Sequence, residues 1–196
     1  MLEEVAHYFW KKEYRSRGVP HYHVLLWIKD APVVGVHSQH TVTEWIDSRI
    51  TCHIPDEKVS SKLHRLVTKY QLHKCSSYCR CKKKYGSAYV THCKFGFPWQ
   101  VSDETVLNKV EDSLKSRNKV YHLQRAVGEE RINDYNPLLL YLWKANLDIQ
   151  YVADSSLALA HYVTGYVTKA EKATCKNCGM TSVSRNHYIR NYGALE

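Results

Sequence analysis

Two segments near the beginning of the chain carry apolar patterns that are typical of β-strands. Residues 5–16 alternate loosely between aromatic and charged side chains, which predicts a half-buried strand. Residues 21–28 have the sequence HYHVLLWI, which predicts a strand that is mostly buried. The intervening RGVP, residues 17–20, is a turn signal. We therefore expect the two segments to pair as a hairpin.

Helical spacing of apolar residues and capping signals predict most of the remaining elements. A helix over residues 41–50 would begin at Thr41 as N-cap, and Glu44 would complete a capping box. A stronger helix is expected from Pro55 to about His73. The further expected elements are an amphipathic helix over 103–114, a strand over 120–127, a short helix over 137–145 after Asn136, a strand over 147–152 and a helix over 155–172.

Composition and charge narrow the class of protein. The chain has 196 residues, a net charge of +9 and 12% aromatic residues, which exclude a disordered tail, a collagen-like chain and a coiled coil. No apolar run is as long as the roughly 20 residues that a membrane span needs. Residues 1–10 lack the apolar core of a secretory signal. We expect an intracellular protein with no membrane partner. Its positive charge favours a polyanionic partner.

Residues 74–98 form an insert rich in Cys, Lys and Gly, which needs a substitute for a hydrophobic core. In a reducing compartment, cysteines at such short spacing indicate zinc ligands more than disulfides or small buried side chains. Four ligands of a closed tetrahedral site would come from His73, Cys75, Cys79, Cys81, His92 and Cys93. Our choice for this structural zinc is His73, Cys75, Cys79 and Cys93, with Cys81 as the main competitor.

A second cysteine pair lies near the end of the chain. Cys175 and Cys178 have the spacing of half a zinc site, to which His187 could add a ligand.

The three consecutive lysines at residues 82–84 could contact phosphates, although a charge run is more often a solvated loop. The chain has no match to the phosphate-binding loop of ATPases.

Two histidines in the second predicted strand could bind a divalent ion. His21 and His23 are two residues apart, so their rings leave one face of a strand. Glu13 has the matching parity across the turn and could supply the third ligand. A pair of surface histidines would show the same spacing.

Two tyrosines in the last predicted helix could act as nucleophiles. Tyr162 and Tyr166 are four residues apart on one face, and Lys169 lies three residues beyond Tyr166. A metal-polarised phosphate and a nearby cation would help a phenol to attack. Two aromatic residues in a core helix would have the same spacing.

Four short motifs follow one another in a particular order. The first is EYRSRGVPHYHVLLW at residues 13–27, and the second is the Cys-rich insert ending in CKFGFP at residues 93–98. The third is YNP at residues 135–137 followed by WKANLDIQ at residues 143–150, and the fourth is YVTGYVTK at residues 162–169. Together they resemble the Helitron helicase-like, or Rep, domain, which belongs to the HUH endonucleases of rolling-circle replication and transposition.

The resemblance implies an α+β fold in which an antiparallel sheet is flanked by helices, as in HUH endonucleases, with a zinc-binding insert at residues 73–98. This domain would span residues 1–172, and residues 173–196 would be a C-terminal extension with the CxxC half-site. A helicase domain would follow in a complete element, although this chain has no helicase motor. The implied location is nuclear or otherwise intracellular.

The resemblance also implies an activity. His21, His23 and a third ligand, Glu13, would hold Mg²⁺ or Mn²⁺, which polarises the scissile phosphate of single-stranded DNA. Tyr162 or Tyr166 would attack, leaving a 5′-phosphotyrosine and a free 3′-hydroxyl. The implied function is metal-dependent nicking and strand transfer in rolling-circle transposition.

Two positions depart from the family pattern. Arg15 stands where members often carry Gln, and because Arg cannot ligate a cation, the third ligand is left to Glu13. Gly165 replaces the usual Lys between the tyrosines, which removes a cation beside the phosphate. The alternative function is therefore a catalytically decayed, zinc-containing DNA-binding module. An RNA-binding zinc protein would need no histidine metal site at all.

Overall fold

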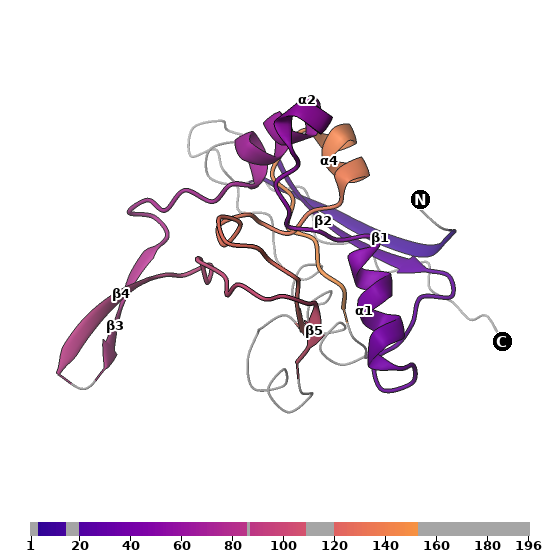
Figure 1. Ribbon diagram of the computed structural model, residues 1–196, viewed down its shortest axis with the longest axis horizontal. Coiled ribbons are helices and arrows are strands. Elements are labelled where there is room, and N and C mark those ends of the chain that lie inside the picture. The colour runs from indigo at the N-terminus through magenta and orange to yellow at the C-terminus, as the bar shows by residue number, and fades with distance from the viewer. Residues whose placement is uncertain (1–3, 15–19, 86, 109–119, 153–196) are drawn as a thin grey trace, which may run out of the picture.

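The computed structural model describes residues 4–14, 20–85, 87–108 and 120–152 (Figure 1). Its elements, in chain order, are β1 (Val5–Tyr14), β2 (Pro20–Ile28), α1 (Gln39–Asp47), α2 (Glu57–Leu66), η1 (Val67–Gln71), β3 (Arg80–Tyr85), β4 (Ala88–Cys93), β5 (Val106–Leu107), β6 (Tyr121–His122) and α4 (Pro137–Trp143). The helix expected over residues 155–172 lies outside the described residues.

The predicted hairpin near the beginning of the chain is confirmed. β1 and β2 pair antiparallel, and Glu13 lies directly opposite His21. β2 is less buried than its sequence predicts, since Val24 is 54% exposed and Leu26 44%. The hairpin passes beside α4 (Figure 1), where the Tyr22 and Trp143 rings meet edge to face at 5.2 Å.

The first two helices begin at residues whose side chains cap them. α1 has Ser38 as its N-cap, because the Ser38 hydroxyl accepts from the Thr41 N–H at 3.1 Å, so the prediction of Thr41 is wrong. α2 follows Asp56, whose carboxylate accepts from the Lys58 N–H at 2.7 Å. It continues through the π-helical turn η1 to Gln71, close to the predicted end.

The helix α4 confirms the prediction over residues 137–145, and Asn136 caps it by accepting from the Leu139 N–H at 3.0 Å. The hydrophobic core lies between the helices and the segments around β6 and residue 132. Its most deeply buried side chains include Val42, Ile46, Cys52, Val67, Tyr121, Ile132, Tyr135 and Leu140. The helices therefore form the body of the protein, and the β1–β2 hairpin lies against it.

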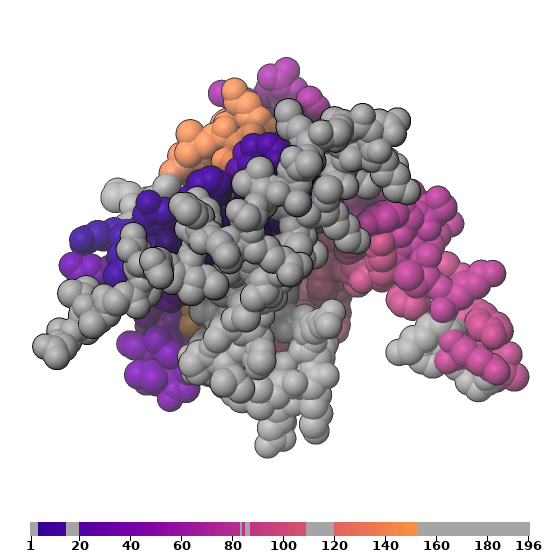
Figure 2. Space-filling model, turned by 180° about the vertical axis from the view of Figure 1, so that it is seen from behind, coloured from indigo at the N-terminus to yellow at the C-terminus, as the bar shows by residue number. Residues whose placement is uncertain are grey.

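The Cys-rich insert is a projecting arm. The composition of residues 74–98 predicts an irregular insert, and this is wrong for part of it, because β3 and β4 pair antiparallel in six-residue strands. Figures 1 and 2 show the arm leaving the body of the protein. A small separate cluster of Cys79, Cys93 and Phe97, with Cys75 and Trp99 packed against it, lies at its base.

The segment after the arm departs from the helical pattern. Residues 103–108, the described part of the predicted helix, contain the short strand β5, which pairs with β6. The Thr105 hydroxyl donates to the Asp47 carboxylate at 2.5 Å and accepts from the Gln124 N–H at 2.8 Å. These tertiary hydrogen bonds outweigh the local pattern.

The strand expected over residues 147–152 is also wrong in the described chain. The Leu147 N–H donates to the Gln71 side chain at 3.2 Å, and the Tyr151 N–H to the Tyr121 hydroxyl at 3.4 Å. Because side chains satisfy these backbone groups, no strand partner is needed. The strand expected over residues 120–127 is limited to β6, with one further bridge between Arg125 and Ser102.

The α+β class with antiparallel strands is confirmed. The described strands form three separate two-stranded sheets, β1–β2, β3–β4 and β5–β6. A single larger sheet flanked by helices, which the family resemblance implies, stays a prediction. Within the described ranges, no helix is long and apolar enough to cross a membrane.

Candidate metal centres

The first candidate centre lies on one face of the β1–β2 hairpin. Glu13 is directly opposite His21, and His23 is two residues further along β2, so all three side chains leave the same face. Lys11, opposite His23, shares that face. The strand parity predicted from the sequence is thus present in the structure.

The distances on this face show a partly assembled set of ligands. Glu13 Oε2 lies 3.5 Å from His23 Nε2, and the His21 and His23 rings meet edge to face with centroids 4.6 Å apart. The His23 and Glu13 side chains are only 12% and 21% exposed. Within the described part of the chain, the ligand atoms of Glu13, His21 and His23 do not all lie within 4.8 Å of one another. A shared ion would therefore require a change of side-chain rotamer.

Tyr162, Tyr166 and Lys169 lie outside the described residues, as do Cys175 and Cys178 of the half-site. Their roles stay predictions from the sequence.

The second candidate centre lies at the base of the arm and comprises His73, Cys75, Cys79 and Cys93. Their ligand atoms all lie within 4.8 Å of one another, so these four residues could hold a metal ion. His73 and Cys75 lie on the chain that leaves η1, and Cys79 directly precedes β3. The β3–β4 pairing returns Cys93 to Cys79, whose carbonyl accepts from the Lys94 N–H at 2.7 Å.

The geometry of this cluster suits a tetrahedral ion. Cys93 Sγ lies 3.3 Å from His73 Nε2, close to the roughly 3.6 Å expected between nitrogen and sulfur ligands of zinc. The Phe97 ring stacks on the His73 ring at 4.3 Å, which holds the imidazole in place. Cys81 lies opposite His92 further along the arm, and neither belongs to the group of four. The pairing of the strands thus decides between the competing cysteines.

Arg131 is a neighbour of the cluster that sequence reasoning missed. Its guanidinium Nη1 donates to Cys75 Sγ at 3.4 Å, and its carbonyl accepts from the His73 N–H at 2.7 Å. Burial and the charge of Arg131 lower the pKa of His73, which favours the neutral imidazole that binds metals. Arg131 is 56 residues from Cys75, so no local sequence signal could have identified it.

Hydrogen bonds at Cys79 favour its thiolate. Burial raises the pKa of the Cys79 thiol, but the Ser76 N–H, which donates to Sγ at 3.1 Å, and the neighbouring thiols of Cys75 and Cys93 outweigh burial and lower it. A thiolate is the form that ligates zinc. The cluster therefore gathers the donor types that a cation requires.

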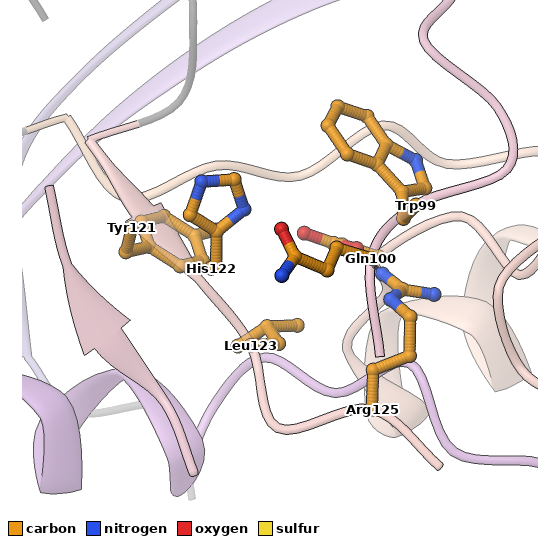
Figure 3. A pocket seen from close by; sticks show the side chains of 7 residues that line it. Trp99, Gln100, Tyr121, His122, Leu123 and Arg125 are labelled. Carbon is orange, nitrogen blue, oxygen red and sulfur yellow. Dashed lines mark hydrogen bonds and ion pairs between the residues drawn. The ribbon is translucent and has the colours of Figure 1, made fainter. Parts of the chain in front are cut away.

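A pocket between the arm base and the core is too small for a substrate. It is lined by Trp99, Gln100, Tyr121, His122, Leu123, Arg125 and Asp134 (Figure 3) and offers about 10 Å³, enough for roughly one water. The Arg125 guanidinium in its wall is buried and occupied, since it donates to Asp134 at 2.9 Å and to the Glu129 and Ile132 carbonyls. These residues stabilise the fold, and the two metal centres remain the candidate functional sites.

Comparison with protein families, with curated proteins and with solved structures found no match to this chain.

Proposed function

We propose that this chain nicks single-stranded DNA and transfers the strand through a 5′-phosphotyrosine, with Mg²⁺ or Mn²⁺ bound by Glu13, His21 and His23. The observation that carries the proposal is the shared face of these three residues on the β1–β2 hairpin. A carboxylate and two imidazoles are a donor set that suits a divalent ion and leaves coordination positions for a substrate. The net charge of +9 supports a polyanionic substrate.

The chemistry assigns a role to each residue. When bound, the ion would withdraw charge from the scissile phosphate. The phenol of Tyr162 or Tyr166 releases its proton to solvent as its oxygen forms a bond to phosphorus, and the bond from phosphorus to the 3′ oxygen breaks. The departing oxygen takes up a proton and becomes the 3′-hydroxyl, while the phosphate stays on the tyrosine. Lys169 stabilises the developing phenolate.

The cluster of His73, Cys75, Cys79 and Cys93 would bind a structural zinc. Four protein ligands close a tetrahedral site, so no position is left for a reacting group. The small hydrophobic cluster around Phe97 provides little other packing for the arm. Zinc binding would supply the free energy that orders the base of the arm.

The second candidate function is a zinc-containing DNA-binding module without cleavage. It is favoured by the contrast between the two centres, because the ligand atoms at the arm base lie within 4.8 Å of one another whereas those on the hairpin require rearrangement. In this case the zinc centre and the positive charge would be retained for binding alone.

Cleavage of labelled DNA separates the two functions. A pool of 3′-labelled single-stranded oligonucleotides is incubated with Mn²⁺ and analysed on a denaturing gel for a protein-linked product. We expect an adduct with the wild-type chain and none with His23→Ala. His7→Ala is the matched control, because His7 is an exposed histidine of the same hairpin. An adduct from His23→Ala contradicts the metal assignment, and DNA binding by the wild type without any adduct favours the second function.

A further inference from the structure

The arm has Lys and Arg side chains but no Asp or Glu. No Asp or Glu occurs between Glu57 and Asp103, and residues 73–98 contain six Lys or Arg. A solvated surface usually mixes both signs. The one-sided charge of this projecting segment instead indicates a polyanionic partner.

The strand register gathers the charges on one face. Arg80, Lys82 and Lys84 alternate along β3, so they leave the same face of the hairpin, and all three are exposed. Tyr89 of β4 lies directly opposite Lys84 and is 67% exposed. The face therefore presents a row of cations with an aromatic ring at its end.

Further aromatic rings lie beside cations at the base of the arm. Tyr78 and Phe95 are 71% and 48% exposed. Lys94 Nζ lies 3.4 Å from the Tyr78 ring centroid and 5.1 Å from that of Phe95. Exposed rings interleaved with cations are the arrangement with which proteins stack the bases and neutralise the phosphates of single strands. A duplex keeps its base faces covered and would leave these rings unused.

We infer that the β3–β4 arm is a contact surface for single-stranded DNA, in which Arg80, Lys82 and Lys84 bind phosphates and Tyr89 stacks on a base. The base of the arm is joined to the metal cluster, because Cys79 directly precedes the first residue of β3 and Cys93 is the last residue of β4. The cluster thus holds the arm at its base and sets its direction. The inference depends on the proposed function only for the choice of DNA, since it concerns binding and not cleavage.

The test is fluorescence anisotropy with a labelled 30-nucleotide oligo(dT), without Mg²⁺ or Mn²⁺ so that no nicking occurs. The arm variant combines Arg80→Gln, Lys82→Gln and Lys84→Gln. The control variant combines Lys58→Gln, Lys62→Gln and Lys69→Gln on α2 and η1, which are also exposed and lower the net charge equally. Both variants keep the four metal ligands, so equal zinc content verifies that the arm is intact.

Each phosphate contact contributes about 0.7 to the slope of log affinity against log salt. Loss of three contacts should lower the slope by about 2 and the affinity roughly 50-fold at about 0.15 M salt. Tyr89→Ala should lower the affinity at least about fivefold and leave the slope unchanged. Tyr89→Phe keeps the aromatic ring and should therefore bind with the affinity of the wild type.

Three results would overturn the inference. The first is an arm variant that loses no more affinity than the control. The second is equal or tighter binding of a duplex of the same length, and the third is equal competition by poly-glutamate of matched charge. A chain that binds oligo(dT) through the arm but forms no covalent adduct would leave this inference standing while the nicking proposal fails.

Discussion

Replacement of Cys79 by Ser should remove one zinc ion from the chain and open the base of the arm. Apart from the cysteines, the side chain buried there is Phe97, which is 8% exposed, and full burial of such a side chain contributes about 1.5–3 kcal/mol. A structural zinc contributes about 10–16 kcal/mol in isolated zinc-binding peptides. Metal binding at this cluster should therefore dominate the local stability of the arm. The core of the body is a separate cluster, so global unfolding should change little.

The size of the effect follows from mass action. With free zinc a hundredfold above its Kd, bound metal stabilises the closed arm by about 2.7 kcal/mol, which corresponds to about a hundredfold lower population of the open form. Limited trypsin digestion reports this population, because Arg80, Lys82 and Lys84 are cleavage sites within the arm. Cleavage of Cys79→Ser in the arm should be about a hundredfold faster than in the wild type at this zinc concentration.

Cys81→Ser is the matched control, because Cys81 lies on the same arm outside the group of four. Its zinc content, measured by mass spectrometry of metals, and its digestion rate should equal those of the wild type. The difference in zinc between the variants is the quantity to compare, since Cys175 and Cys178 could add to the total. A Cys79→Ser protein with unchanged zinc and unchanged digestion would refute the assignment.

Asp134→Ala leaves the buried Arg125 guanidinium without its carboxylate partner at 2.9 Å. This should lower the free energy of unfolding by about 3 kcal/mol, or the melting temperature measured by calorimetry by roughly 6–12 °C. Glu4→Ala breaks an exposed pair with Lys29 and should leave the melting temperature nearly unchanged. Burial disfavours the charge of Glu129, but hydrogen bonds from Ile54, Ala126 and His53 outweigh burial and lower its pKa. Ionised Glu129 thus stabilises the fold above the unfolded-state pKa of about 4.3, and this stability is lost as pH falls through the lowered folded-state value. Glu129→Gln should therefore flatten the acid side of a profile of melting temperature against pH, and an unchanged profile would count against this role. Tyr166→Phe should lose most of the covalent DNA adduct, Tyr162→Phe less and the double variant all of it, because Lys169 is one turn from Tyr166 in the predicted helix; an inactive Tyr162→Phe beside an active Tyr166→Phe would reverse the order.

Local sequence patterns determined the elements that are stabilised by residues close to one another along the chain. Alternation along residues 5–28, with a turn between the halves, was enough to predict the β1–β2 hairpin and the shared face of Glu13, His21 and His23. Asn136 before an apolar run was enough to predict α4 and its cap. Short spacing also limited the candidate ligands at the arm base to six residues, and these include the four that the structure brings together.

Only the tertiary structure decided the features that depend on distant partners. Residues 103–108 have a helical pattern, but two hydrogen bonds of the Thr105 hydroxyl hold them extended: it donates to Asp47 of α1 and accepts from the Gln124 N–H after β6. The choice of Cys79 and Cys93 over Cys81 required the register of β3 with β4, and the role of Arg131 required a contact across 56 residues. Such partners are set by the packing of the whole chain, because a backbone or charged group is stabilised by whichever partner the fold brings within hydrogen-bond distance, however far away it is in the sequence.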